Sequence, residues 1–399
     1  MRVAVSPSGP IQGRRVAVTG LGALSCAGVG VEALWSALQS PEAPPSKRIA
    51  AFDASHLGNA KELRRLDPFA LYALMAADEA WLESGLEGPF EDAGSLVTTG
   101  IGGLQTVLEQ DGVLLNKGPD RVSPFLVPML MPNAATAAVS MRYGLGGPAE
   151  TVTTACAAGT HAIGNAARLV ASGRCNIVVA GGAEAVIIDL AEAGFRNMTA
   201  LSNTNFSRPF DVDRDGFVMG EGAGILILEE WDYALARGAT ILAEVVGAAS
   251  TADAHHITAP DPSGSGAVRC MEIALADAEL RPEDVSHINA HGTSTPLNDL
   301  AEARAVHRVF GDTPPPATSI KGHLGHSLAA AGALEGVASV LTLRDQMIPP
   351  TAGTTVIDPE VDLDVVIGAP RAATVDVILS NSFGFGGHNG SVIFRRAEF

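Results

Sequence analysis

The chain has 399 residues, a net charge of −18 and 47% hydrophobic residues. Such an apolar content excludes a disordered chain, and so acidic a surface repels phosphate backbones, so nucleic acid is not expected as a partner. Only 5% of the residues are aromatic, whereas 44 are glycine, which favours closely packed helices and sheets over an all-β sandwich. The composition therefore predicts an α/β protein with a large core.

The cysteines and the apolar runs indicate the compartment. The four cysteines are Cys26, Cys156, Cys175 and Cys270, and none lies in a CxxC spacing. We therefore expect reduced thiols and a cytoplasmic protein. No apolar run reaches the roughly 18 residues of a membrane span, and residues 1–13 lack the apolar core of a signal peptide.

The first predicted element is a buried strand over residues 16–19, which we expect to end in a tight turn at Gly20 and Gly22. A helix follows over residues 31–39. Strand–glycine–helix openings bind dinucleotides in many proteins, but Ser25 stands at the third glycine position of the GxGxxG fingerprint. We assign these glycines to turn formation and expect no dinucleotide cofactor.

Strands and helices then alternate along the rest of the chain. Helices are predicted over residues 67–85, 156–172, 266–278, 299–310 and 332–344. Strands are predicted over residues 95–103, 149–154, 176–182, 224–228, 241–248, 285–289, 375–380 and 391–395. Residues 124–132 are predicted to be irregular, and because they are apolar we expect them to line a pocket or an interface. The alternation of strands and helices is similar in the two halves of the chain, so we predict two duplicated halves sharing one core, residues 14–240 and 241–399.

Cys156 follows an apolar strand-like segment and begins a predicted helix. The amides at a helix N-terminus favour the thiolate, so this position predicts a lowered pKa for Cys156. The neighbours Ala155, Ala157, Ala158 and Gly159 are small enough to let a thioester approach. The alternative, a buried and inert cysteine, remains open from these residues alone.

Two histidines and a lysine stand in glycine-rich loops that follow strands, where α/β proteins concentrate their chemistry. They are His291, His326 and Lys321, and a glycine-dense turn surrounds Phe385. Together with Cys156 they form a candidate nucleophile–base set. We expect no metal, because His287 and His291 are four residues apart on a predicted strand and its exit, whereas such pairs chelate on a helix.

Five motifs together resemble the elongating β-ketoacyl-acyl-carrier-protein synthases of the thiolase superfamily. They stand in the family order over about residues 14–396 and read TACAAG, SRPFDVDRDGFVMGEGAG, NAHGTSTPLND, KGHLGH and NSFGFGGHNG. The resemblance implies a five-layered αβαβα thiolase fold. It also implies condensation of an acyl thioester with a malonyl-acyl carrier protein in fatty-acid elongation, with no cofactor.

The resemblance further implies a role for each matching residue. Cys156 would carry the acyl chain, His291 and His326 would stabilise the enolate during decarboxylation, and Lys321 would hold the His326 region electrostatically. The amides of Cys156 and Phe385 would form the oxyanion hole, and the Phe385 side chain would gate the acyl pocket. The remaining implied positions are Thr293 and Thr295 on the pantetheine arm, Ile101 and Phe195 along the acyl tunnel, and Glu335 and Asn381 as supporting residues. For Glu335, a surface position on its helix remains the alternative.

A basic cluster and the apolar residues 124–131 indicate where an acyl carrier protein and a second copy of the chain would bind. Lys61, Arg64 and Arg65 fall on one face if helical, and with Lys117 and Arg121 they form a candidate docking site for an acidic acyl carrier protein. The alternative is a solvated helix face. The family assembles as dimers, so we expect a twofold dimer with residues 124–131 at its interface.

Several departures from the family pattern leave the chemistry intact but bear on carrier docking and chain length. His388 replaces a threonine that is common in bacterial members, the loop at residues 203–206 is short, and Thr199 stands where arginine is frequent. A second interpretation, with the same chemistry, is a ketosynthase subunit of a dissociated polyketide or polyene pathway, acting with a chain-length-factor partner. Cys156 argues against a non-catalytic chain-length factor, and the two histidine motifs argue against a coenzyme A thiolase.

Overall fold

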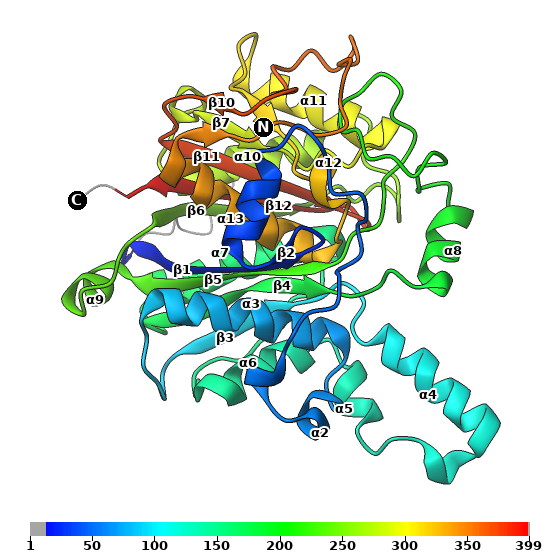
Figure 1. Ribbon diagram of the computed structural model, residues 1–399. Coiled ribbons are helices and arrows are strands. Elements are labelled where there is room, and N and C mark those ends of the chain that lie inside the picture. Colours follow the sequence, from blue (N-terminus) through cyan, green and yellow to red (C-terminus); the bar gives the residue numbers. More distant parts are fainter. Residues whose placement is uncertain (1–12, 398–399) are drawn as a thin grey trace.

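The computed structural model describes residues 13–397 (Figure 1). The expectation about a signal peptide concerns residues 1–13 and so falls almost wholly outside this range. One ten-stranded sheet runs through the molecule in the order β3-β4-β5-β1-β6-β12-β11-β7-β8, with β2 beside β1. The strands are β1 (Val16–Ser25), β2 (Gly28–Val29), β3 (Gly94–Thr98), β4 (Ile177–Glu184), β5 (Gly222–Glu230), β6 (Ala243–Ala252), β7 (His287–Asn289), β8 (Ala317–Thr318), β11 (Val377–Gly384) and β12 (His388–Arg396). A separate pair consists of β9 (Met347–Ile348) and β10 (Arg371–Ala372).

The topology repeats. The order β3-β4-β5-β1 of the first half matches the order β7-β11-β12-β6 of the second half. In each set the first pair of strands is parallel and the next two pairs are antiparallel. The two sets join through a short antiparallel pairing of β1 with β6. The predicted duplication is therefore present, and one core spans both halves; the boundary at residue 240 stays a prediction.

The layers alternate as the thiolase resemblance predicts. Helices α3 (Pro68–Ser84) and α6 (Ala134–Tyr143) cover the outer face of the first half-sheet, and α10 (Ser265–Asp277), with α11 (Pro296–Phe310) against it, covers that of the second. Between the half-sheets lie α7 (Ala158–Ala171) and α13 (Ala329–Asp345), which contact strands of both halves. The five-layered αβαβα fold is confirmed.

The two central helices pack unusually closely. A Cβ atom at Gly159 of α7 would lie 2.6 Å from the Ala329 carbonyl oxygen of α13, so no larger residue fits there. This contact explains why the segments that begin both helices are rich in alanine and glycine. It also brings the first turns of the two helices together, and these turns follow Cys156 and His326 directly.

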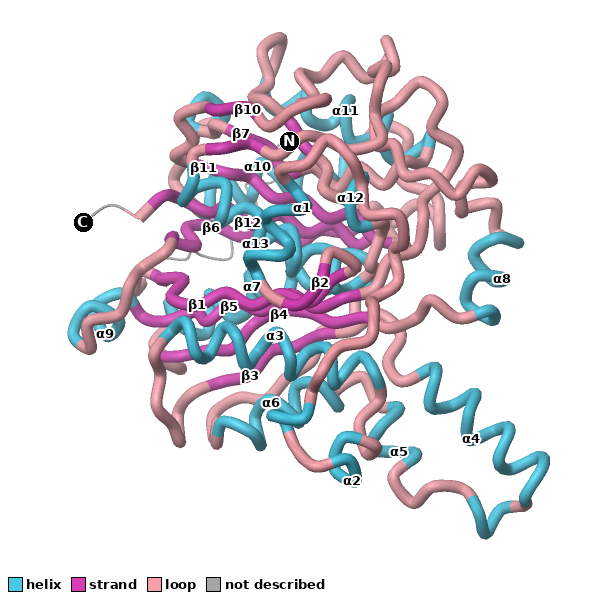
Figure 2. Tube along the Cα trace, in the orientation of Figure 1, coloured by secondary structure: helices cyan, strands magenta, loops and turns pink. Residues whose placement is uncertain are grey.

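The remaining helices lie around this layered body (Figure 2). They are α1 (Val31–Leu38), α2 (Ala60–Leu63), α4 (Leu104–Lys117), α5 (Leu126–Leu130), α8 (Asp189–Asn197), α9 (Trp231–Ala236) and α12 (Lys321–Leu324). Single 3₁₀ turns occur at Ser55–Leu57, Pro119–Arg121, Ala155–Ala157 and Pro282–Asp284. Within residues 13–397 no helix is long and apolar enough to cross a membrane, and the four cysteines are free thiols.

Three predictions about local structure were wrong. Gly20 and Gly22 lie inside β1 rather than in a turn, because α3 packs so closely there that a Cβ atom at Gly22 would lie 1.8 Å from the Ala76 carbonyl oxygen. Residues 149–154 form no strand and pair with β3 only through a bridge between Ser95 and Ala149. Residues 124–132 are not wholly irregular, since they contain α5.

Candidate active site

Cys156 lies on a tight turn between an extended segment and α7. The turn is the 3₁₀ helix Ala155–Ala157, and Ala155 has a φ of 50°, in the left-handed region that non-glycine residues seldom adopt. The side chain of Cys156 is 5% exposed and lines a cavity of about 350 Å³. The same cavity is lined by His291, His326 and Phe385, so the structure brings four of the sequence-predicted residues together.

The predicted lowering of the Cys156 pKa is wrong. Burial raises the pKa of the thiol to about 11, and the charge of Glu184 acts in the same direction. A hydrogen bond from the Phe385 amide and the charge of Lys321 lower this pKa, but they offset burial only in part. The thiol form therefore dominates at neutral pH.

The two histidines face each other across the cavity floor. His291 follows β7, His326 follows α12, and their ring centroids are 5.4 Å apart at an interplanar angle of 85°. Burial, followed by the positive charge of Lys321, lowers the pKa of both imidazoles well below its usual range. Both rings are consequently neutral near pH 7, and a neutral imidazole can donate one N–H to a developing oxyanion.

Lys321 and Glu335 form a buried ion pair behind the histidines. Lys321 Nζ donates to Glu335 Oε1 and, at 2.6 Å, to the backbone oxygen of His291. The side chains of Lys321 and Glu335 are 2% and 0% exposed. The surface alternative for Glu335 is thereby excluded, and the pair fixes the backbone of His291.

Phe385 lies in the glycine-rich turn between β11 and β12. Its ring centroid is 6.4 Å from that of Phe195, which in turn makes an edge contact of 5.3 Å with Phe217. The Gly386 amide donates to the Ile257 carbonyl oxygen at 2.8 Å, so the turn is tied to the loop that lines the other side of the cavity. Phe385 lines the cavity, as a gate would, whereas Phe195 does not line it and lies behind Phe385 and Phe217.

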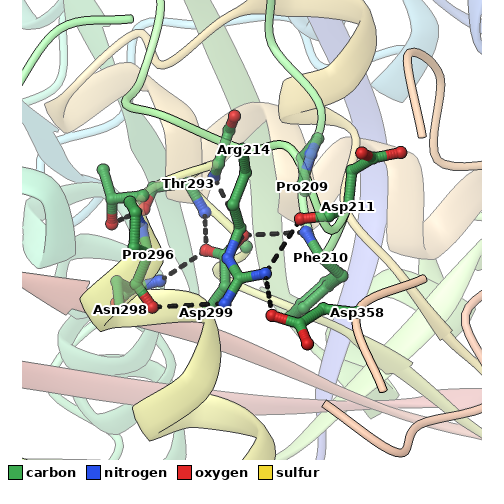
Figure 3. Close-up of polar contacts among 12 residues, drawn as sticks. Pro209, Phe210, Asp211, Arg214, Thr293, Pro296, Asn298, Asp299 and Asp358 are labelled. Atoms are coloured by element: carbon green, nitrogen blue, oxygen red, sulfur yellow. Dashed lines mark hydrogen bonds and ion pairs between the residues drawn. The ribbon is translucent and has the colours of Figure 1, made fainter. Parts of the chain in front are cut away.

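Thr293 and Thr295 line the cavity, and a buried polar network holds the segment that carries them (Figure 3). Their hydroxyl oxygens are 2.9 Å apart. Asp299 accepts the Thr293 amide at 2.9 Å and the Phe210 amide at 2.8 Å. Arg214 lies 3.8 Å from Asp299 and 2.6 Å from Asp358 in two ion pairs. The network therefore holds the backbone at Thr293, next to the cavity.

The carboxylate that holds the backbone of His291 was not predicted from the sequence. Glu302 accepts the amides of His291 and Gly292, each at 2.7 Å, and burial raises its pKa to about 8. Glu302 stands three residues after Asp299 on a correctly predicted helix, so both project from one face towards the histidine segment. That spacing was the available signal.

Other predicted residues lie outside the cavity. Ile101 is 38% exposed in the turn between β3 and α4 and does not line the cavity of this single chain. Asn381 is buried in β11, where its side chain contacts Met271 and Ser391 rather than the site. The proposed docking residues Lys61, Arg64, Arg65, Lys117 and Arg121 are all exposed on and beside α2 and α4. Within residues 13–397 no group of three or more histidine, cysteine or acidic side chains could hold a metal ion.

A five-layered fold that places a cysteine at the start of one central helix and a histidine at the start of the other defines a condensing enzyme of the thiolase type. Two family models agree with this class: the description "Beta-ketoacyl synthase, N-terminal domain" matches residues 39–234, and the corresponding C-terminal domain matches residues 242–355. The chain belongs to the β-ketoacyl synthase family and is an acyltransferase.

Relatives and solved structures match over nearly the whole chain. A protein of Synechocystis named 3-oxoacyl-[acyl-carrier-protein] synthase 2 is 45% identical, over 97% of this chain and 99% of its own length. The solved ishigamide ketosynthase/chain length factor has a TM-score of 0.91 and 34% identity, over 97% of this chain and 100% of its own. A type II polyketide acyl-carrier protein in complex with its ketosynthase matches with a TM-score of 0.87 and 32% identity, over 97% and 100% of the two chains.

Proposed function

We propose that the protein elongates fatty acids by condensing an acyl group on Cys156 with a malonyl-acyl carrier protein, with loss of CO₂. The observation that carries the proposal is that Cys156, His291 and His326 line the same cavity. The 45% identity with a protein named 3-oxoacyl-[acyl-carrier-protein] synthase 2 supports this reaction and the carrier-bound substrate.

In the first step the Cys156 sulfur attacks the carbonyl carbon of the acyl thioester. The tetrahedral oxyanion accepts hydrogen bonds from the amides of Cys156 and Phe385, a role supported by the interaction of the Phe385 amide with the thiol. The carrier thiolate leaves and takes up the proton that Cys156 releases. Because the pKa of Cys156 is about 11, we expect acylation to need the bound carrier substrate. For the same reason, Cys156 should react only slowly with small alkylating reagents.

In the second step the malonyl carboxylate leaves as CO₂, and the electron pair of the broken C–C bond forms an enolate. His291 and His326 donate N–H groups to the enolate oxygen, which their neutral state permits. The enolate carbon then attacks the Cys156 thioester, and the Cys156 thiolate that leaves takes up a proton from solvent. Thr293 and Thr295, with hydroxyls on the cavity wall, would bind the pantetheine arm.

Condensation with acyl carriers of graded chain length tests this function. Purified protein, malonyl-acyl carrier protein and acyl carriers of increasing length should give β-ketoacyl carriers two carbons longer, detected by mass spectrometry. Cys156→Ala should abolish the product, whereas Cys175→Ala is the matched control, because it changes a buried cysteine outside the cavity. Product from the Cys156→Ala variant would contradict the assignment.

A ketosynthase subunit of a type II polyketide pathway is the second candidate function. The TM-score of 0.91 with the ishigamide ketosynthase/chain length factor favours it, and a heterodimer would then replace a homodimer. The same assay separates the two: elongation by the protein alone supports the fatty-acid role. Activity that requires a co-expressed, inactive homologue, with several additions of two carbons, supports the polyketide role.

A second copy of the chain is the proposed occupant of an exposed apolar face. Figure 1 shows α4 projecting from the body, and this helix and the neighbouring segment carry exposed Val107, Leu108, Leu114, Leu115, Phe125, Val127 and Met131. So many exposed apolar residues on one region favour an interface, and a twofold dimer would cover them. Light scattering should give the mass of a dimer at micromolar concentration, and the mass of a monomer would contradict this.

The basic cluster around α2 is the proposed docking site for the acyl carrier protein. Lys61 and Arg64 are exposed, and the Arg65 guanidinium lies 4.3 Å from the centroid of the Phe125 ring. Because the protein itself carries −18, attraction to an acidic carrier must be local, within the Debye length of about 8–10 Å at physiological salt.

Charge reversal tests the docking site. The double variant Arg64→Glu and Arg65→Glu should raise the KM for carrier-bound substrate while the alkylation of Cys156 is unchanged. Reversal of Arg304, which is exposed on α11, is the matched control. Unchanged carrier kinetics and salt dependence in the double variant would place docking elsewhere.

Phe385 is the proposed gate of the acyl pocket. Phe385→Ala should leave the Cys156 thiol reactive but alter kinetics towards acyl and malonyl carriers, and unchanged kinetics towards both would contradict a gate. Ile101, which this single chain leaves exposed, would line the acyl tunnel once a second copy covers it. The four free thiols support a reducing, cytoplasmic location.

A further inference from the structure

A buried carboxylate that the proposed chemistry does not use lies beside Cys156. Glu184 ends β4, its side chain is 0% exposed, and it accepts hydrogen bonds from neutral donors only. The Thr99 hydroxyl donates to Oε1 at 2.7 Å, and the Gly100 amide donates to Oε2 at 2.8 Å. The amide of Ile101 also interacts with the carboxylate, so the whole turn between β3 and α4 converges on one side chain.

The same carboxylate holds the first residue of the central helix α13. The Ala329 amide, a donor without a partner inside its own helix, donates to Glu184 Oε2 at 3.3 Å. No side chain of its own segment caps α13. A negative charge at the N-terminus of this 17-residue helix is favoured by the helix dipole. Glu184 therefore supplies from β4 the cap that the local sequence lacks.

The residues on either side of this contact belong to the site. Leu328, directly before Ala329, has a φ of 47° and lines the cavity with Cys156, and His326 is two residues further back. The turn between β3 and α4, which the Glu184 carboxylate also holds, carries Ile101. A strained residue such as Leu328 persists only where its surroundings fix it, and Glu184 supplies a fixed point one residue away.

We propose that Glu184 is a positioning residue for the condensation, which holds the His326–Leu328 segment and the turn carrying Ile101 in fixed register with Cys156. The inference rests on the roles of Cys156 and His326 proposed above. Gly100 fits this role, since a Cβ atom there would lie 2.8 Å from Glu184 Oε2 and would push the turn away.

The charge of Glu184 gives the role a signature that simple packing would not have. Burial raises the pKa of Glu184 to about 7, while the four donors favour its ionised form. Among the charged groups that act on the Cys156 thiol, Lys321 lowers its pKa and Glu184 raises it. Removing the charge of Glu184 while keeping its size should therefore lower the pKa of Cys156.

The test compares Glu184→Gln with Glu229→Gln in the full-length enzyme. Glu229 is an equally buried carboxylate, but on β5 it pairs with Arg237 and Thr19, away from the cavity. The rate of Cys156 alkylation by iodoacetamide is followed against pH by mass spectrometry of the Cys156 peptide. Acyl-carrier kinetics give kcat and KM separately.

For Glu184→Gln we expect alkylation of Cys156 at pH 8 to be about three- to tenfold faster than in wild type. We also expect kcat to fall about tenfold with the carrier KM unchanged, since small misplacements of reacting groups are costly. The Glu229→Gln control should match wild type in both. Wild-type alkylation and kcat in a folded Glu184→Gln protein would overturn the proposal.

If Glu184→Gln does not fold, Thr99→Val decides, because it removes the 2.7 Å hydrogen bond and leaves the charge in place. This variant should lower kcat about threefold with KM unchanged, and a wild-type kcat would overturn the proposal. Failure of the condensation itself is recognisable separately, because wild-type protein would then yield no β-ketoacyl product while the alkylation of Cys156 would still be measurable.

Discussion

Replacing Lys321 by methionine should destabilise the protein severely, because Lys321 is the cation that compensates Glu335. Lys321 pairs with Glu335 and donates to the His291 carbonyl oxygen at 2.6 Å. Without it, the fully buried Glu335 keeps only a hydrogen bond of 3.4 Å from the Ser382 hydroxyl. Breaking one partner of a buried pair costs about 3–5 kcal/mol, a large share of the roughly 5–15 kcal/mol by which folded proteins are stable.

Most of this cost should come from the uncompensated charge, which a second substitution can remove. Lys321→Met combined with Glu335→Gln should recover about 1–3 kcal/mol relative to Lys321→Met alone, as expected for coupled residues in contact. Urea unfolding followed by tryptophan fluorescence should rank the midpoints as wild type, then the double variant, then Lys321→Met. A double variant no more stable than the single one would refute this reasoning.

Three further predictions concern stability and catalysis. Burial lowers the pKa of His287 to about 3, so the stability that the neutral imidazole contributes is fully present above its unfolded pKa near 6.5 and is lost as pH falls. His287→Phe should therefore reduce the loss of stability between pH 6.5 and 4.5 by about 2–3 kcal/mol, measured from urea midpoints. An unchanged pH dependence of stability would contradict this. Gly22→Ala should lower the stability by about 1–3 kcal/mol because α3 leaves no room for a methyl group. Gly112→Ala on α4, where a Cβ atom would meet nothing within 4 Å, should raise the stability by about 0.5–1 kcal/mol. Equal melting temperatures of the two variants would disprove the close approach of α3 to β1 at Gly22. His291→Ala and His326→Ala should each slow decarboxylation by about 10²–10³, with a smaller effect on self-acylation. A larger loss of self-acylation than of decarboxylation would contradict enolate stabilisation by these histidines.

Composition and the alternation of strands and helices predicted an α/β protein with two similar halves, and the five-layered fold was predicted by the family resemblance of the five motifs. Prediction from the sequence failed where tertiary contacts override local patterns. Gly20 and Gly22 imitate a turn motif, but they are strand residues made small by the packing of α3. Helix α4 was missed although Leu104, Val107 and Leu108 stand at helical spacing within it.

The site was predictable where residues stand in motifs, and less so where a single acid acts across the fold. Cys156, His291 and His326 converge on one cavity as expected. Glu184 was missed because the amides it holds stand about 80 residues or more away in the sequence, whereas the spacing of Asp299 and Glu302 was a signal that went unused. The pKa of Cys156 was predicted with the wrong sign, because a sequence reveals the helix N-terminus but not the depth of burial.

The central claim is that Cys156 carries the acyl chain, and intact-protein mass spectrometry tests it most directly. Wild-type protein incubated with an acyl-acyl carrier protein should gain the mass of one acyl group, located by proteolysis on the peptide that contains Cys156. The Cys156→Ala variant should gain no mass under the same conditions, and subsequent malonyl carrier should discharge the wild-type adduct as a β-ketoacyl product. An acyl adduct on the Cys156→Ala variant, or a wild-type adduct on another residue, would contradict the account.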